Sequence, residues 1–189
     1  MCGIAGIYAV KTDRPVERAL LARMAGTLNH RGPDEHGFHV RGGIGLAHTR
    51  LSIIDLSGGS QPIYNEDRNL CVVFNGEIFN YIELREFLEK KGHRFYTRSD
   101  TEVIVHMYEE YGKECFNRFN GQFAIALWDG RNRELVLARD RVGVRPLFYS
   151  LLPDGTLVFA SEMKAIFCYP GFEPEIDPEG INQIFTIWV

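Results

Sequence analysis

The sequence has few cysteines, and they are not spaced for a zinc site or a disulfide framework. The four cysteines, Cys2, Cys71, Cys115 and Cys168, are far apart in the 189-residue chain, and no C-x-x-C motif occurs. Zinc sites and disulfide-rich secreted domains need closely paired Cys or His residues. We therefore expect three buried thiols, and we consider Cys2, which follows the initiator methionine, separately.

Long apolar runs and a large net charge are also absent. No apolar segment approaches the roughly 20 residues that span a bilayer, and the N-terminus lacks the basic and apolar regions of a signal peptide. The formal net charge is −4, which gives no reason to expect a nucleic acid or a membrane as partner. The six histidines are scattered, and the closest pair, His36 and His39, fits strand or loop positions better than metal ligation. We expect a cytoplasmic protein without a metal site.

The composition, 45% hydrophobic and 24% charged residues, is typical of a globular protein. The length suits one domain. Hydrophobic periodicity predicts helices over 15–30, 81–92 and 99–112, the last with a capping box formed by Ser99 and Glu102 and with Asp100 in its first turn. Period-2 and continuous apolar patterns predict strands over several segments: 2–10, 36–40, 44–56, the start of 70–81, and 93–97.

The predicted strand over 44–56 alternates polar and apolar residues. His48, Arg50 and Ser52 share one face, and Leu51 and Ile53 point to the other, so we expect a wet face and a dry face.

The second half of the chain predicts an antiparallel meander. Residues 122–162 alternate strand and turn, with turn chemistry at Asp129-Gly130 and at residues 153–155. Strands that gather at both ends of the chain, with helices between them, indicate an α+β layered domain rather than alternating parallel βα units.

The end of the chain carries an apolar helical stripe formed by Ile181, Ile184, Phe185 and Trp188. Such a stripe needs a partner surface. We expect residues 1–170 to form one domain, and residues 171–189 to form a linker and the start of a further domain of a longer protein.

Several polar groups together match the needs of an enzyme that holds an amino acid and cleaves its side-chain amide. They are the thiol of Cys2, the strand arginine Arg50, the pair Asn75 and Gly76 after a buried strand, and Asp100 near a helix start. Each alone has an ordinary structural explanation, as a small apolar residue, strand filler, a turn or a helix cap. In combination they are the parts that such an enzyme needs.

A series of motifs follows in order from Cys2 to about Ile166: "MCGIAGIY", "NHRGPDEHG", "HTRLSIIDL", "QPIYN", "VFNGEIFNY", "SDTEV", "FNGQFAIALWD", "ARDRVGVRPLFY" and "FASEMKA". These motifs resemble the glutaminase domain of asparagine synthetases, within the class II glutamine amidotransferases and the N-terminal nucleophile hydrolases. The resemblance implies a four-layer αββα sandwich of α+β class with its active site at the N-terminal strand. It also implies that Met1 is removed, which would give Cys2 both a thiol and an α-amino group whose pKa of about 7.7 to 8.0 suits a base.

The resemblance also implies catalytic roles beside Cys2. Asn75, through its side-chain amide, and Gly76, through its backbone N–H, would form the oxyanion hole. We expect glycine at this position to let the substrate approach closely.

Substrate contacts are implied at both ends of a bound glutamine. Arg50 would pair bidentately with the α-carboxylate, because its planar fork matches a carboxylate. Glu77 and Asp100 would hold the α-ammonium, with Asp100 the more direct contact. The wall beside Arg50 would be lined by the main chain of four residues: Leu51, Ser52, Ile53 and Ile54.

The stretch "SGGS" at 57–60 begins like the Ser-Gly-Gly-x-Asp-Ser loop that binds pyrophosphate in synthetase domains. Gln61 and Pro62 stand where the Asp and Ser would complete it. We therefore expect a plain loop and no cofactor in these residues, with ATP and Mg required only by the full-length protein.

The expected activity is hydrolysis of glutamine through a Cys2 thioester, with the ammonia used for asparagine synthesis from aspartate. The expected partners are glutamine, a missing C-terminal synthetase domain and, as an open alternative, a second copy in a homodimer. Three other interpretations stay open: a different ammonia acceptor, a different N-terminal nucleophile amide hydrolase, and a non-enzymatic interaction domain. Arg50 and Asp100 argue against the second, because they suit a zwitterionic amino acid.

Overall fold

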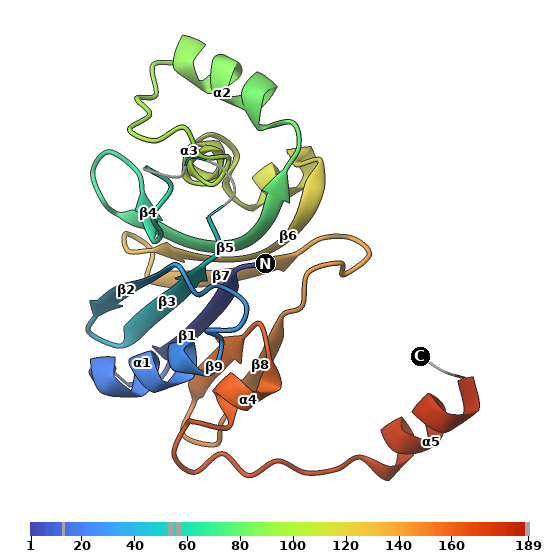
Figure 1. Cartoon of the computed structure of the whole chain (residues 1–189). Helices are drawn as coiled ribbons and strands as arrows, with labels where there is room; N and C mark the ends of the chain where they lie inside the picture. Colours follow the sequence, from blue (N-terminus) through green and yellow to red (C-terminus); the bar gives the residue numbers. More distant parts are fainter. Residues whose placement is uncertain (13, 53–54, 56–57, 188–189) are drawn as a thin grey trace.

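Two antiparallel sheets form the centre of the structure, a computed structural model that describes residues 1–12, 14–52, 55 and 58–187 (Figure 1). The first, here called the β1 sheet, has the order β2-β3-β1-β9-β8, and the second, the β5 sheet, has the order β4-β5-β6-β7. The strands of the β1 sheet are β1 (Gly3–Ala9), β2 (Glu35–Arg41), β3 (Ile44–Arg50), β8 (Phe148–Leu151) and β9 (Thr156–Ala160). Those of the β5 sheet are β4 (Ile63–Tyr64), β5 (Leu70–Ile78), β6 (Gly121–Asp129) and β7 (Glu134–Arg139).

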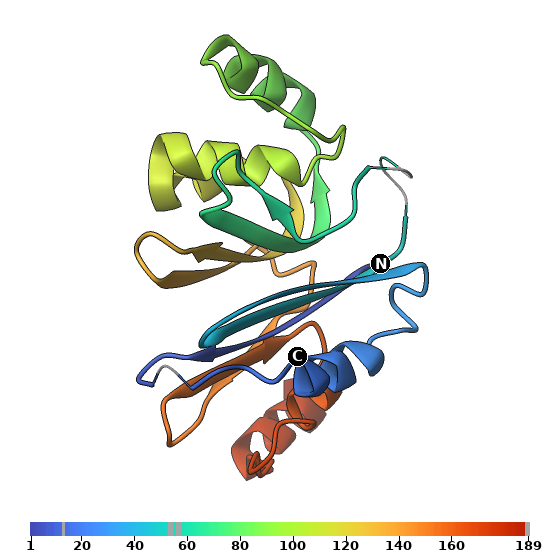
Figure 2. The same ribbon diagram turned by 90° about the vertical axis from the view of Figure 1, so that its left-hand side faces the viewer.

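Helices cover the outer face of each sheet. The helices of the described chain are α1 (Arg18–Gly26), α2 (Tyr81–Lys90), α3 (Glu102–Tyr111), α4 (Met163–Ile166) and α5 (Pro178–Ile187), with a 3₁₀ helix at Gly112–Arg118, and all but α5 belong to the layers outside the sheets. The sheets stack face to face, with α1 and α4 against the β1 sheet and α3 against the β5 sheet, while α2 packs on α3 (Figures 1 and 2). This order of layers confirms the predicted αββα sandwich.

Strand β3 shows why the two sheets stay together. Leu46 belongs to the apolar layer between the sheets, and Ala47 belongs to the layer beneath α1. Every residue of β3 is buried, and alternation places His48 and Arg50 on the same face as Leu46. The prediction of a wet face for this strand is therefore wrong, because the second sheet covers that face. The strand also ends at Arg50, short of the predicted residue 56.

The predicted meander is also wrong in its connectivity. β6 pairs with β7 in one sheet, whereas β8 pairs with β9 in the other. The chain crosses between the sheets in the segment 140–147, so the four strands form two separate hairpins. Alternation along a strand predicts that the strand exists but does not indicate which sheet it joins.

Segment 93–97 forms no strand, contrary to the prediction. Its backbone N–H groups donate to carboxylates instead of a ladder: Arg94 N to Glu66 Oε1 (3.0 Å), and Tyr96 N and Thr97 N to Glu102 (2.9 and 2.7 Å). Glu102 therefore turns back toward Thr97 and makes no capping box with Ser99. Helix α3 begins at Glu102, which leaves residue 100 just before the helix rather than in its first turn.

The cysteines and the last helix complete the comparison with the sequence. All four cysteines are free; Cys71 and Cys115 are buried as predicted, whereas Cys168 is only half-buried. The predicted C-terminal helix forms as α5, none of its described side chains is buried, and it lies apart from the sandwich (Figure 1). Trp188 lies outside the described residues, and the division at residue 170 stays a prediction. Among the described helices, none is long and apolar enough to span a bilayer.

Candidate active site

The backbone of Cys2 is anchored at the start of β1 by residues that lie far away in the sequence. Arg31 Nε donates to the Cys2 carbonyl (3.0 Å), and Arg31 Nη1 pairs with Glu162 Oε1 (2.9 Å). Two residues further along, in β1, Ile4 N donates a hydrogen bond to Ser161 Oγ (3.0 Å). The sequence analysis assigned no role to Arg31 or Glu162, although both lie within quoted motifs. They fix where the Cys2 side chain leaves the backbone.

The Cys2 thiol is half-buried beside the first residue after β3. Its Sγ accepts a hydrogen bond from Leu51 N (3.4 Å). Burial raises the pKa of the Cys2 thiol above its ordinary value, while the Leu51 hydrogen bond and the positive charge of Arg50 act in the opposite direction. A thiol with a raised pKa is mostly protonated at neutral pH and needs a nearby base to become a nucleophile.

Most of the predicted site residues meet in one pocket between the ends of the two sheets. Those that line it are Cys2, Arg50, Leu51, Asn75, Gly76, Glu77 and Asp100. Ser52 is not among the residues that line this pocket, and its backbone N–H donates to Asp34 Oδ2 (2.8 Å). Ile53 and Ile54, also predicted for this wall, lie outside the described residues.

Asn75 supplies a buried donor to the pocket. The residue is 1% exposed, and its Nδ2 makes no hydrogen bond to any residue that the structure describes. Because buried donors are nearly always paired, an unpaired amide at a pocket wall is a group prepared for a ligand. This is the property that an oxyanion site requires.

Gly76 follows on β5 and is a glycine for a reason other than the predicted one. A Cβ at this position would lie 2.0 Å from the carbonyl oxygen of Gln122 on β6. The neighbouring strand therefore excludes any side chain, whatever occupies the pocket. The role of the Gly76 N–H in an oxyanion hole stays a prediction.

Asp100, which also lines the pocket, is held in place by two hydrogen bonds. Its Oδ2 accepts from Ile78 N (3.0 Å), and Ser99 Oγ donates to Oδ1 (3.3 Å). Burial raises the pKa of Asp100, and the Ile78 hydrogen bond opposes that rise. Glu77, half-buried on β5, also raises it through like charge. These two carboxylates give the pocket wall its negative charge, as a substrate ammonium group would require.

Arg50 brings positive charge to the other side of the pocket. Its side chain is only 6% exposed, with Nη1 3.3 Å from Glu35 Oε2 and Nη2 donating to the Asp55 carbonyl (2.5 Å). These contacts hold the guanidinium in one orientation. A fixed planar fork is suited to bind a carboxylate bidentately.

Gln61 is a structural part of the site that the sequence analysis treated only as loop. Its Oε1 accepts from Phe74 N (2.7 Å), and its Nε2 donates to Phe74 O (3.2 Å) and to Thr101 Oγ1 (3.3 Å). The side chain thus completes the β5 ladder beside Asn75 and ties it to the neighbour of Asp100. A fully buried glutamine gives no periodic pattern, so spacing alone could not reveal this role.

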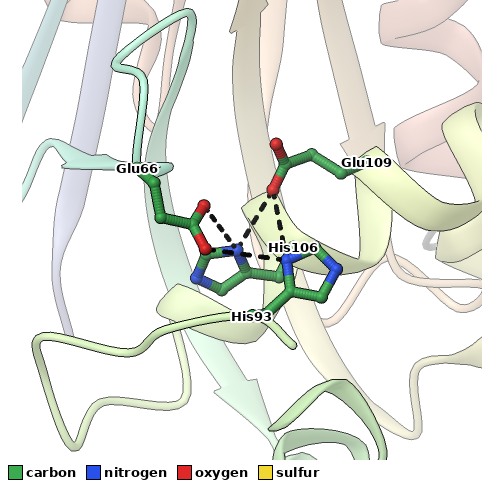
Figure 3. Close-up of side chains that lie close together, drawn as sticks. All are labelled: Glu66, His93, His106 and Glu109. Atoms are coloured by element: carbon green, nitrogen blue, oxygen red, sulfur yellow. Dashed lines mark hydrogen bonds and ion pairs between the residues drawn. The ribbon is translucent and has the colours of Figure 1, made fainter. Parts of the chain in front are cut away.

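Away from this pocket, four further polar side chains converge: Glu66, His93, His106 and Glu109 (Figure 3). The sequence analysis expected no metal site because the histidines are scattered along the chain. The fold brings two of them together, with their rings 4.8 Å apart.

The fold has a solved counterpart. The glutamine phosphoribosylpyrophosphate amidotransferase from B. subtilis, complexed with ADP and GMP, superposes with a TM-score of 0.72 over 88% of this chain and 43% of that chain, at 22% identity. The two chains therefore share one fold, two stacked antiparallel sheets with helices on their outer faces, which is the sandwich of the N-terminal nucleophile hydrolase type.

The sequence comparisons then place the chain more closely. The family model of the glutamine amidotransferase domain matches residues 1–189, so the chain belongs to that family. It is 45% identical over 172 residues to asparagine synthetase [glutamine-hydrolyzing] 2 of Bacillus subtilis (strain 168), and 42% identical over 177 residues to asparagine synthetase [glutamine-hydrolyzing] 3 of Arabidopsis thaliana. Each match covers 90% of this chain, but only 23% and 30% of the respective relatives. The chain therefore corresponds to less than a third of those proteins.

Proposed function

We propose that this domain hydrolyses glutamine to glutamate and ammonia with Cys2 as the nucleophile. The observation that carries the proposal is the shared pocket of the Cys2 thiol and the unpaired amide of Asn75. A nucleophile and a free oxyanion donor that face one cavity are the minimal equipment for acyl transfer.

The proposed reaction has two halves. The Cys2 thiolate attacks the side-chain carbonyl carbon of glutamine, and the Asn75 amide and Gly76 N–H stabilise the oxyanion. The C–N bond then breaks, the nitrogen takes up a proton and leaves as ammonia, and a thioester remains on Cys2. Water attacks the thioester carbon, the S–C bond breaks, and glutamate leaves with the thiol regenerated.

The proposed base is the α-amino group of Cys2, which becomes free when Met1 is removed. In the unprocessed chain this nitrogen is an amide with no basic lone pair, and Met1 lines the same pocket. Removal of Met1 would therefore both create the base and clear the approach to the thiol. A base is needed because burial raises the pKa of this thiol.

Arg50 and Asp100 are proposed to select a zwitterionic amino acid. Both line the pocket and carry opposite charges, so they suit the α-carboxylate and the α-ammonium of glutamine. Glu77 adds negative charge on the side of Asp100. A substrate that lacked either charged group would lose one of these contacts.

The proposed destination of the ammonia is asparagine synthesis from aspartate in a C-terminal synthetase domain. The relatives named as glutamine-hydrolysing asparagine synthetases support this acceptor, and their greater length leaves room for such a domain. ATP and Mg would act there and not in this pocket. Another ammonia acceptor is the main alternative.

The experiment compares ammonia release by three proteins with N-termini confirmed by intact mass: the processed form, the form that retains Met1, and Cys2→Ala. We expect turnover by the processed form only. The Met1 form should be at least about a hundredfold slower, because a positioned base contributes roughly 10²–10⁴-fold. Cys2→Ala should bind glutamine without hydrolysing it. Turnover by Cys2→Ala would refute the nucleophile assignment, and equal rates for the first two forms would refute the amine as base.

A further inference from the structure

Four ligating side chains from three separate segments converge beside the outer face of the β5 sheet (Figure 3). Glu66 comes from the turn between β4 and β5, His93 from the segment after α2, and His106 and Glu109 from α3. One ligand atom of each lies within 4.8 Å of those of the other three. We propose that this cluster, here called the His93 cluster, binds a divalent transition-metal ion of the zinc type.

The spacing of the ligand atoms matches a tetrahedral ion. Zn–N and Zn–O bonds of about 2.0–2.2 Å put neighbouring ligand atoms of a tetrahedron about 3.3–3.6 Å apart. The Nδ1 atoms of His93 and His106 lie 3.5 and 3.1 Å from the same oxygen, Glu109 Oε2. The Glu66 carboxylate lies 3.9 Å from His93 Nδ1 and 3.5 Å from His106 Nδ1. The two Glu66 distances are to different oxygens, Oε1 and Oε2, so the carboxylate would turn to place one of them on the ion.

The donor set favours zinc over the hard cations. Imidazole nitrogen suits Zn²⁺ and its neighbours in the first transition row, whereas Ca²⁺ and Mg²⁺ prefer sites made of oxygen alone. Two nitrogen and two carboxylate ligands therefore select a borderline ion.

A carboxylate faces the far nitrogen of each histidine, within hydrogen-bond distance at His93 and as a longer ion pair at His106, and carboxylates in this position are typical of metal sites. His93 Nε2 lies 3.1 Å from Glu110 Oε1, and His106 Nε2 lies 3.6 Å from Glu102 Oε1. Such partners leave the Nδ1 atoms, which face the centre of the cluster, free to act as ligands.

The two carboxylates of the cluster are also held from outside. Arg94 N donates to Glu66 Oε1 (3.0 Å), and Asn65 Nδ2 donates to Glu109 Oε1 (2.8 Å). Three of the four candidate ligands, Glu66, His93 and Glu109, are thus oriented by a hydrogen bond from outside the cluster, which an accidental surface cluster does not require.

The four candidate ligands differ in burial, so the site is enclosed on most sides and open to solvent on one. The side chains of His106, His93 and Glu109 are 1%, 13% and 20% exposed, whereas that of Glu66 is 41% exposed. An ion could enter past Glu66 and then be enclosed by the other three.

A bound ion would cross-link three segments of the chain near the active site. Segment 93–97 has no strand partner, yet it leads directly to Ser99 and Asp100 on the pocket wall. A metal that joined His93 to α3 and to the β4–β5 turn would restrain this segment.

The test is titration of chelator-treated, untagged protein with ZnCl₂ by calorimetry, in a Cys2→Ala background that removes the active-site thiol. We expect one equivalent to bind. At a free zinc concentration a hundred times Kd, the melting temperature should rise by roughly 5–10 °C. Co²⁺ as a second probe should give the visible bands of a tetrahedral ion without a thiolate charge-transfer band.

Two ligand variants and one matched control identify the site. Glu66→Gln and His93→Ala should each weaken zinc binding by at least the roughly 10–100-fold typical of lost outer-sphere partners, and should abolish most of the thermal shift. His36→Ala, which removes an exposed histidine on β2, should bind zinc as its parent does. If His93→Ala does not fold, the zinc affinity of Glu66→Gln alone tests whether the His93 cluster is the binding site.

Three outcomes would overturn the proposal. They are the absence of saturable zinc binding, unchanged affinity in Glu66→Gln, and a thiolate band in the cobalt spectrum that shows binding at a cysteine. The first would identify the His93 cluster as a network of ion pairs only.

Discussion

Replacement of Asn75 by alanine should separate catalysis from folding. Its Nδ2 is buried and makes no hydrogen bond within the described part of the chain. Asn75→Ala therefore breaks no such bond in the resting protein and removes an unpaired polar atom from the interior. We expect the free energy of unfolding to change by less than about 1 kcal/mol, because the loss of a few side-chain atoms offsets the relief of an unsatisfied donor.

The catalytic effect of the same change should be large. An oxyanion-hole donor contributes about 2.7–4 kcal/mol to the stability of the transition state, which corresponds to a loss of roughly 10²–10³ in kcat. KM for glutamine should change little, because the charged anchors Arg50 and Asp100 stay in place. Steady-state ammonia release, together with urea unfolding of the same sample, measures both quantities.

Asn80→Ala is the matched control, because Asn80 lies just after the same strand and is bonded at both ends of its amide. Its Nδ2 donates to Arg118 O (3.0 Å), and its Oδ1 accepts from Asn120 N (2.9 Å). This variant should lose stability but keep the kcat of the folded fraction. If Asn75→Ala instead kept its kcat, or if it lost as much stability as Asn80→Ala, the oxyanion role would be refuted.

Two further predictions use the charged and titrating groups of the inter-sheet face. Arg50→Lys should raise KM for glutamine by roughly 10–100-fold, because a charge-assisted hydrogen bond is worth about 1.5–3 kcal/mol and one ammonium cannot also serve Glu35 and Asp55; a parental KM would assign Arg50 to structure alone. Burial lowers the pKa of His48 from 6.5 to about 3, so between these values only the unfolded chain binds a proton there and acidification favours unfolding. From pH 6.5 to 5 this should cost the parent about 1.6 kcal/mol that His48→Gln does not lose, measured as the difference in pH slope by chemical denaturation. Parallel slopes would show that His48 is not buried as a neutral ring.

The elements of the fold could be predicted from the sequence where the determinants are local. Helices α1, α2 and α3 carry apolar residues at helical spacing, and the hairpin turns carry glycine at Gly130 and Gly155, so these features were found. Sheet membership could not be predicted in this way. The wet face expected for β3 and the meander expected after residue 122 both failed, because a second sheet, distant in sequence, covers the first.

The residues of the candidate site likewise fall into those that the sequence predicted and those that only the fold revealed. Cys2, Arg50, Asn75 and Asp100 stand in local motifs, and the combination of these motifs in the sequence was enough to predict them as site residues. Arg31, Gln61 and the His93 cluster act through partners remote in sequence; Arg31 and Glu162 are separated by 131 positions. Only the fold could bring such groups together.

The architecture explains why the pocket needs both sheets. Cys2 directly precedes β1 and Arg50 ends β3, both on the side of the β1 sheet, whereas Asn75 and Gly76 belong to β5. The position of the thiol relative to the oxyanion donor is therefore set by the packing between the sheets. That layer holds small residues, Ala124 and Ala126, beside large ones such as Phe159.

On the β1 side the same close approach is visible at Gly6. A Cβ there would lie 2.3 Å from Phe159 Cζ, so the ring occupies the space that a side chain would take. A tightly packed layer of this kind resists changes of even one methylene group. The geometry of the pocket thus depends on buried apolar residues that never touch the substrate. Loops alone could not hold a nucleophile from one sheet and an oxyanion donor from the other at a constant separation.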